Sequence, residues 1–139
     1  MNTIIANVGA RVSLAEFKSQ VATEGLPRVL YLVYRRNEDN GKYRLIYIGD
    51  STAEFVNQFE TSPLYKELLA WAYDAPDILA YSVVKVDDSM YEVACNAMIY
   101  ALQPALNSSG KESFNYDDVM VIFNGRDVCR RSFIRVSGS

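Results

Sequence analysis

Two tyrosines mark the candidate site whose chemistry is easiest to read from the sequence. Tyr31 lies in the apolar run of residues 29–34. Tyr47, sixteen residues after Tyr31, begins the triplet that ends at Gly49. A phenol in such a position can take a proton from an attacking water or contact a bound ligand. Glycine lets a ligand approach the backbone closely. With Ser51, these residues are our candidate ligand-binding group.

These runs, followed much later by Pro104 and Asn107, resemble the GIY-YIG nuclease family over residues 28–107. The resemblance implies a three-stranded antiparallel sheet flanked by helices. It also implies a site of two tyrosines, one arginine and one metal-binding glutamate. Tyr31 and Tyr47 stand where the family places its two tyrosines, and Asn107 resembles its terminal asparagine.

Three departures from the family pattern indicate that ordinary nuclease action is lost. Asn57 stands where the family carries its arginine, so the cation that stabilises the scissile phosphate is missing. Cys95 replaces the glutamate, and a lone thiol is a poor ligand for Mg²⁺. Val29 replaces the first glycine, and Thr61 lies where many members place histidine. We therefore interpret Tyr31, Tyr47, Asn57, Cys95 and Asn107 as vestigial.

Glu92 offers one route by which a metal site is rebuilt. It lies one helical turn before Cys95, and the i, i+3 spacing puts the two side chains side by side. Its carboxylate is displaced by roughly 5 Å along the helix axis. We expect no cofactor and no tightly bound divalent metal. Mg²⁺ is expected to bind only if Glu92 has rebuilt the site.

Each candidate also has a purely structural interpretation. Tyrosines are ordinary strand residues, so Tyr31 and Tyr47 are equally well explained by packing. Cys95 shares a helical face with apolar residues, which favours a buried structural thiol. A turn-forming asparagine after Pro104 accounts for Asn107. The arginines of the predicted hairpins are interpreted as surface charges, with a small basic patch among some of those near the C-terminus as the less favoured interpretation; they are Arg35, Arg36, Arg126, Arg130, Arg131 and Arg135.

Composition narrows the classes of function. The 139 residues suit one domain, and we expect a single domain over residues 1–139. The absence of histidine excludes zinc hydrolases and catalytic triads built on His. A net charge of −3 disfavours tight non-specific binding to nucleic acid. Two widely spaced cysteines, no signal-like start and no membrane-length apolar run predict a cytoplasmic protein without membrane contact.

Caps and periodicity predict an α+β fold. Ser13 starts a helix that ends near Gly25, and a hairpin spans residues 29–48 around Asn40-Gly41. Ser51 opens a second helix, and Ser62 with Pro63 opens a third. A strand over residues 78–86 and a helix up to about residue 102 complete the GIY-YIG-like core. The N-terminal helix and a C-terminal β-hairpin over residues 119–136 are additions that dock onto this core.

The leading functional hypothesis is a catalytically inactive GIY-YIG-like domain that acts by binding. Its expected partner is a protein such as a nucleic-acid enzyme, which it inhibits or regulates, and a phage or mobile element is the suggested origin. The alternatives are a weak metal-dependent DNA endonuclease and a nucleic-acid binder that does not cleave. In the binding interpretations the contact residues are Tyr31, Tyr47, Gly49, Ser51 and Asn57. Partner identity and oligomeric state are left open.

Overall fold

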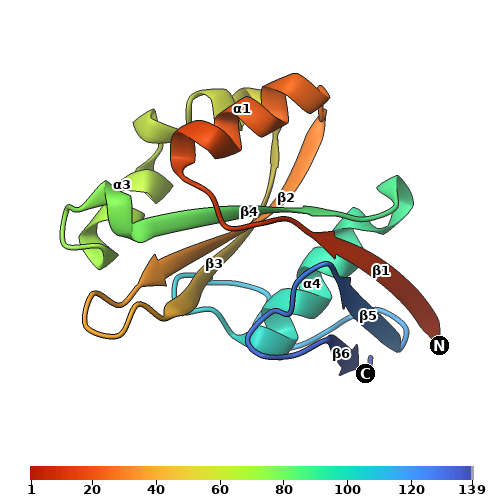
Figure 1. Cartoon of the computed structure of the whole chain (residues 1–139). Coiled ribbons are helices and arrows are strands. Elements are labelled where there is room, and N and C mark those ends of the chain that lie inside the picture. Colours follow the sequence, from red (N-terminus) through yellow and green to blue (C-terminus); the bar gives the residue numbers. More distant parts are fainter. Residues whose placement is uncertain (139) are drawn as a thin grey trace.

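The chain is built on one curled mixed sheet of six strands, in the order β3-β2-β4-β1-β5-β6 (Figure 1). This computed structural model describes residues 1–138. All neighbouring strands are antiparallel except β1 and β5, which are parallel. The strands are β1 (Asn2–Val8), β2 (Arg28–Arg36), β3 (Tyr43–Thr52), β4 (Leu79–Lys85), β5 (Val119–Asn124) and β6 (Phe133–Val136).

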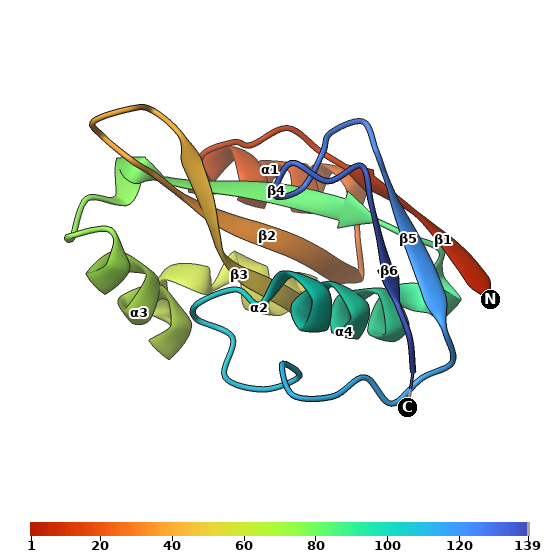
Figure 2. The same cartoon turned by 90° about the horizontal axis from the view of Figure 1, so that it is seen from below.

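Four α-helices cover the two faces of the sheet in the described residues. They are α1 (Leu14–Glu24), α2 (Ala53–Asn57), α3 (Pro63–Trp71) and α4 (Tyr91–Leu102). Helices α1, α2 and α3 pack against one face, and α4 packs against the other. Figure 2 shows β5 and β6 curling around the α4 side. None of the helices in residues 1–138 is long and apolar enough to span a membrane.

The α+β class and most predicted elements are confirmed, with one cap corrected. Ser13 caps α1 by accepting from the Glu16 N–H, and Ser62 caps α3. The cap of α2 is Thr52, which accepts from the Phe55 N–H, and not Ser51 as predicted. Ser51 is still paired in the sheet, opposite Val29. Because β3 is still paired with β2 at Ser51, α2 begins only after Thr52.

The sheet is larger than the predicted three strands because the sequence reading missed β1. Strands β3, β2 and β4 are adjacent and antiparallel. Strand β1 then pairs with β4 on one side and with β5 on the other. The C-terminal hairpin β5–β6 is thus part of the main sheet and not a separate addition. The pairing of Asn2 with Val119 is too remote in sequence for a local pattern to reveal it.

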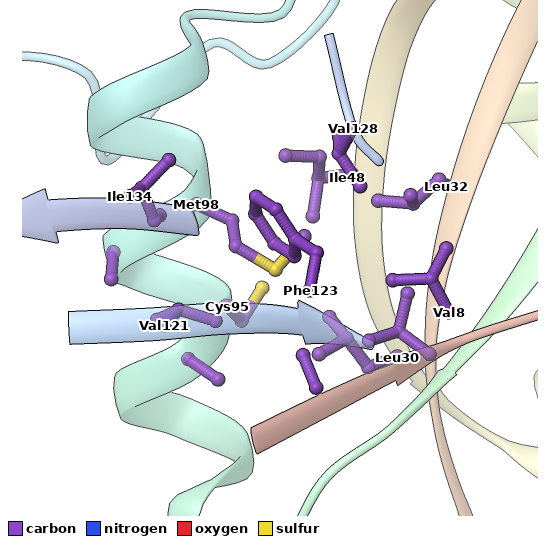
Figure 3. Close-up of a cluster of buried hydrophobic side chains, with 14 of the residues drawn as sticks. Val8, Leu30, Leu32, Ile48, Cys95, Met98, Val121, Phe123, Val128 and Ile134 are labelled. Carbon is purple, nitrogen blue, oxygen red and sulfur yellow. The ribbon is translucent and has the colours of Figure 1, made fainter. Parts of the chain in front are cut away.

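Two separate cores lie on the two faces of the sheet. Figure 3 shows the α4-side core, where Cys95 and Met98 point from α4 toward the strands. The opposite core is rich in aromatic rings, which belong to Phe17, Tyr31, Phe59 and Tyr81. The rings that contact each other are 5.4–6.4 Å apart between centroids. Strand β2 lies between both cores, so its successive side chains enter them alternately.

Candidate functional site

Tyr31 is fully buried, with its ring lying across the backbone of Gly49 on the neighbouring strand. The two residues are cross-strand partners. A Cβ atom placed on Gly49 would lie 2.2 Å from the Tyr31 Cζ, well inside contact distance. Packing of this ring therefore explains the glycine without any ligand. The close approach that the sequence predicted at Gly49 is made by a side chain of the protein itself.

The surroundings of Tyr31 keep its phenol protonated. Its ring packs with Phe17 at 5.5 Å, Tyr47 at 6.1 Å and Phe59 at 6.0 Å between centroids. Burial, reinforced by the Tyr47 phenol, raises the Tyr31 pKa far above its ordinary value. Because a general base must lose its proton near neutral pH, this phenol is unsuited to activating a water.

The other predicted binding residues do not surround an open cleft with Tyr31. Tyr47 is half-buried against the same aromatic core, and burial raises its pKa. The Ser51 hydroxyl lies near the Tyr31 phenol and partly offsets the rise in its pKa. Asn57 is exposed at the C-terminal end of α2.

Cys95 belongs to the other core. It is buried on α4 among apolar side chains, and burial raises the pKa of its thiol to about 12. Tyr31 packs on the α1 side of the sheet and Cys95 on the α4 side. The two residues still interact electrostatically, because the Cys95 charge is among the causes that raise the Tyr31 and Tyr47 pKa values.

A charged pair that sequence reasoning missed lies close to Cys95. Arg28 donates to both carboxylate oxygens of Asp50, at 2.9 and 2.6 Å. The bond with Asp50 raises the Arg28 pKa, and the Asp50 charge helps to raise that of Cys95. Asp50 directly follows Gly49, but nothing in the sequence connects it with Arg28 before the strands are paired.

Glu92, the residue proposed to rebuild a metal site, is engaged elsewhere. Its carboxylate accepts a hydrogen bond from the Tyr116 hydroxyl at 2.9 Å. Within residues 1–138, no three His, Cys, Asp or Glu side chains are grouped so that they could hold a metal ion. The donor set near Cys95 does not resemble the oxygen cage that Mg²⁺ prefers.

Asn107 has a structural role that its turn-like sequence context did not reveal. Its amide pairs with the backbone of edge strand β3, accepting from the Ile48 N–H and donating to the Ile48 carbonyl, both at 2.9 Å. The Leu106 N–H donates to the Ile46 carbonyl at 2.9 Å. The chain after α4 therefore covers part of an edge that would otherwise carry unpaired backbone groups.

A large hollow lies away from these candidates and is lined by cations. We call it the basic groove; its volume is about 950 Å³. It lies between the β2–β3 hairpin, the segment before α1, the end of α4 and the β5–β6 connection. The cations that line it are Arg11, Lys42, Arg44, Arg126 and Arg130. Sequence analysis found only the last two, as members of the less favoured basic patch, because the five come from three distant segments.

No protein-family model, curated protein or solved structure matches this chain. The likeness to GIY-YIG nucleases therefore depends only on the residues quoted in the sequence.

The positions of the two cysteines predict a sharp difference in reactivity. At pH 8, iodoacetamide should modify exposed Cys129 in the folded protein and leave Cys95 unmodified, because the thiolate is the reactive form. Denaturant should expose both. Intact-mass spectrometry counts the adducts, with Cys129→Ser as the control that takes no label when folded. Rapid native labelling of Cys95 would contradict its placement in the core.

The same thiol gives stability a pH dependence. Its folded pKa of about 12 lies above the ordinary value of 9.0, so the unfolded chain ionises first. Its contribution to the free energy of unfolding is complete below pH 9 and is lost as the pH rises toward 12. Comparing denaturation of the parent and of Cys95→Ala at pH 8 and 10.5 isolates this effect. An equal loss of stability in both proteins would contradict it.

Removing the Asn107 amide should destabilise the fold. Asn107→Ala leaves the buried Ile48 N–H and carbonyl without their partners, so we expect a loss of about 2–4 kcal/mol in the free energy of unfolding. Urea denaturation measures it. Ser108→Ala, at the exposed neighbouring position, is the matched control and should change stability by less than about 0.5 kcal/mol. Similar values for both variants would show that the amide does not secure the edge.

Proposed function

We propose that this chain is a GIY-YIG-like domain without nuclease activity that acts by binding a protein partner. The observation that carries the non-catalytic part is the burial of Tyr31 and Cys95, each in its own core, which raises the pKa values of both groups and keeps them protonated. The antiparallel order β3-β2-β4 supports the likeness in fold. Tyr31 and Cys95 contribute to the packing of the two cores.

An exposed apolar row supports a protein partner. Ile5, Ile122 and Phe133 lie directly opposite one another on β1, β5 and β6. Their side chains are on the face away from α4, since the residues that alternate with them fill the α4-side core. Ile5 is 49% exposed and Phe133 is 52% exposed. Exposed apolar rows of this kind favour protein contacts over contacts with phosphate.

The partner's chemistry follows from the row. A partner bound to this row would bury Phe133, and aromatic side chains are enriched in such interfaces. Regulation of a nucleic-acid enzyme by this contact remains part of the proposal. It is supported by the likeness to a nuclease and by the acidic balance of the chain.

The proposal predicts that the lost site cannot be restored by replacing two residues. Asn57→Arg with Cys95→Glu supplies a cation and a carboxylate, but the carboxylate enters the α4-side core, away from Tyr31. We expect no plasmid nicking with Mg²⁺ or Mn²⁺. We also expect a loss of about 3 kcal/mol or more in the free energy of unfolding from the unpaired buried charge.

Asn57→Arg alone is the matched control, because position 57 is exposed; it should remain as stable as the parent and also inactive. Gel electrophoresis of supercoiled plasmid and urea denaturation provide the two measurements. Metal-dependent nicking by the double variant, or by the parent, would overturn the non-catalytic proposal.

The partner contact is tested with the exposed row itself. Affinity capture from a host lysate with the parent should recover a protein that Phe133→Asp and Ile5→Asp each fail to retain. Tyr73→Asp is the control, because Tyr73 is an exposed aromatic residue on another part of the surface. Equal retention by all four proteins would show that the row is not the contact.

A further inference from the structure

The basic groove concentrates positive charge on a protein whose net charge is −3. Five of the fourteen Lys and Arg residues line it, but only one of the seventeen Asp and Glu residues, Asp127, does so. Figure 2 shows the β2–β3 hairpin, the β1–α1 segment and the β5–β6 connection along the same edge of the molecule. Charge of one sign in a concave site attracts ligands of the opposite sign.

The groove cations are not neutralised within the protein. None of the five forms a salt bridge in residues 1–138, whereas Lys18, Arg28 and Lys85, all outside the groove, are each paired with a carboxylate. Unpaired arginines in a hollow keep their N–H donors available. Guanidinium groups bind phosphate through two parallel hydrogen bonds, which makes arginine suited to phosphate recognition.

Arg11 is held in place by aromatic rings. Its guanidinium lies 4.3 Å from the ring centroid of Tyr43 and 5.3 Å from that of Tyr34. Such stacking helps to hold the cation in the groove. Tyr43 remains 39% exposed. The groove therefore presents aromatic surface beside a positioned cation, a combination found where nucleotide bases and phosphates are bound together.

Tyr34 adds a hydroxyl beside the Arg11 guanidinium. Tyr34 lines the groove and is only 3% exposed, and its hydroxyl interacts with Arg11. Burial raises its pKa to about 12, while Arg11 and Arg126 act in the opposite direction. The phenol is thus a protonated donor near two guanidinium groups.

The turn that carries Arg130 has an unusual backbone. Cys129 and Arg130 both have positive φ values, 51° and 63°, in a tight turn closed by two hydrogen bonds between Val128 and Arg131. Glycine and asparagine normally occupy such positions. Side chains that hold this conformation are often found at functional sites. Here the turn places Arg130 on the wall of the groove.

We propose that the basic groove binds the phosphates of a nucleotide chain, with Arg11, Arg126 and Arg130 contacting phosphate and Tyr43 providing a surface for a base. Five cations exceed what a single phosphate can neutralise, so the ligand carries several. A single-stranded nucleic acid and a nucleoside triphosphate share this chemistry. Binding at the groove is separate from the apolar row and from the positions of Tyr31 and Cys95.

The experiment measures fluorescence anisotropy of a labelled twelve-nucleotide single strand with the full chain, at about 50 mM salt and with added salt. Arg126→Glu with Arg130→Glu should weaken binding by about tenfold or more. It should also lower the slope of log affinity against log salt by about 1.4, since each single-strand phosphate contact contributes about 0.7. Lys66→Glu with Arg135→Glu, two exposed cations outside the groove, is the charge-matched control and should bind like the parent.

A second readout does not depend on charge. Cys129 lines the groove and is exposed, so bound oligonucleotide should slow its alkylation by iodoacetamide. Competition with unlabelled nucleoside triphosphate distinguishes the two sources: displacement at equal affinity identifies the free nucleotide, and weak displacement identifies the strand.

Three results would overturn the proposal. The first is that neither ligand binds at low salt. The second is that the groove variant and the control variant weaken oligonucleotide binding equally. The third is that the rate of Cys129 alkylation is unchanged at saturating oligonucleotide. Binding of labelled polyglutamate in the absence of any nucleotide binding would instead identify an acidic protein segment as the ligand, and would equally exclude the phosphate assignment.

Discussion

The burial of β2 on both faces is the constraint on which the rest of the structure depends. Residues 29–34 are all buried, and successive side chains of a strand point to opposite faces. Val29, Tyr31 and Val33 therefore enter the aromatic core, while Leu30, Leu32 and Tyr34 enter the α4-side core. This alternation separates Tyr31 from Cys95. It also directs Tyr34 toward the basic groove.

The two edge strands of the sheet are protected from unwanted pairing in different ways. Strand β3 is partly covered by Leu106 and Asn107, whose hydrogen bonds to Ile46 and Ile48 imitate a short seventh strand. Strand β6, at the other edge, has only four residues, which limits the length of backbone available for unwanted pairing. The broader apolar surface beside it is on the sheet face, where Ile5, Ile122 and Phe133 align. A contact there would use side chains more than backbone.

The net charge of the protein disfavours binding to nucleic acid, whereas the local charge of the basic groove favours it. The acidic total argues against non-specific attraction to nucleic acid over the whole surface. The basic groove restricts any such attraction to one hollow, where Arg11, Arg126 and Arg130 gather from the two ends of the chain. An acidic surface around a basic site favours a ligand that fits the groove over one that only carries negative charge. A protein contact on the apolar row and a phosphate ligand in the groove are compatible, because different residues form them.

The sequence by itself determined the elements whose signals are local. Ser13 and Ser62 cap their helices as predicted, since a cap needs only the next three residues. The hairpin at Asn40-Gly41 follows from one short turn, whereas the pairing of Tyr31 with Gly49 also requires the bulge between Val33 and Tyr34. Only the tertiary structure decided which face each side chain occupies and which distant segments meet. Strand β1 requires β5, the Cys95 environment requires Arg28 and Asp50, and the basic groove requires three segments at once. None of these can be read from a local pattern, because each is selected by the burial of apolar surface across the whole sheet.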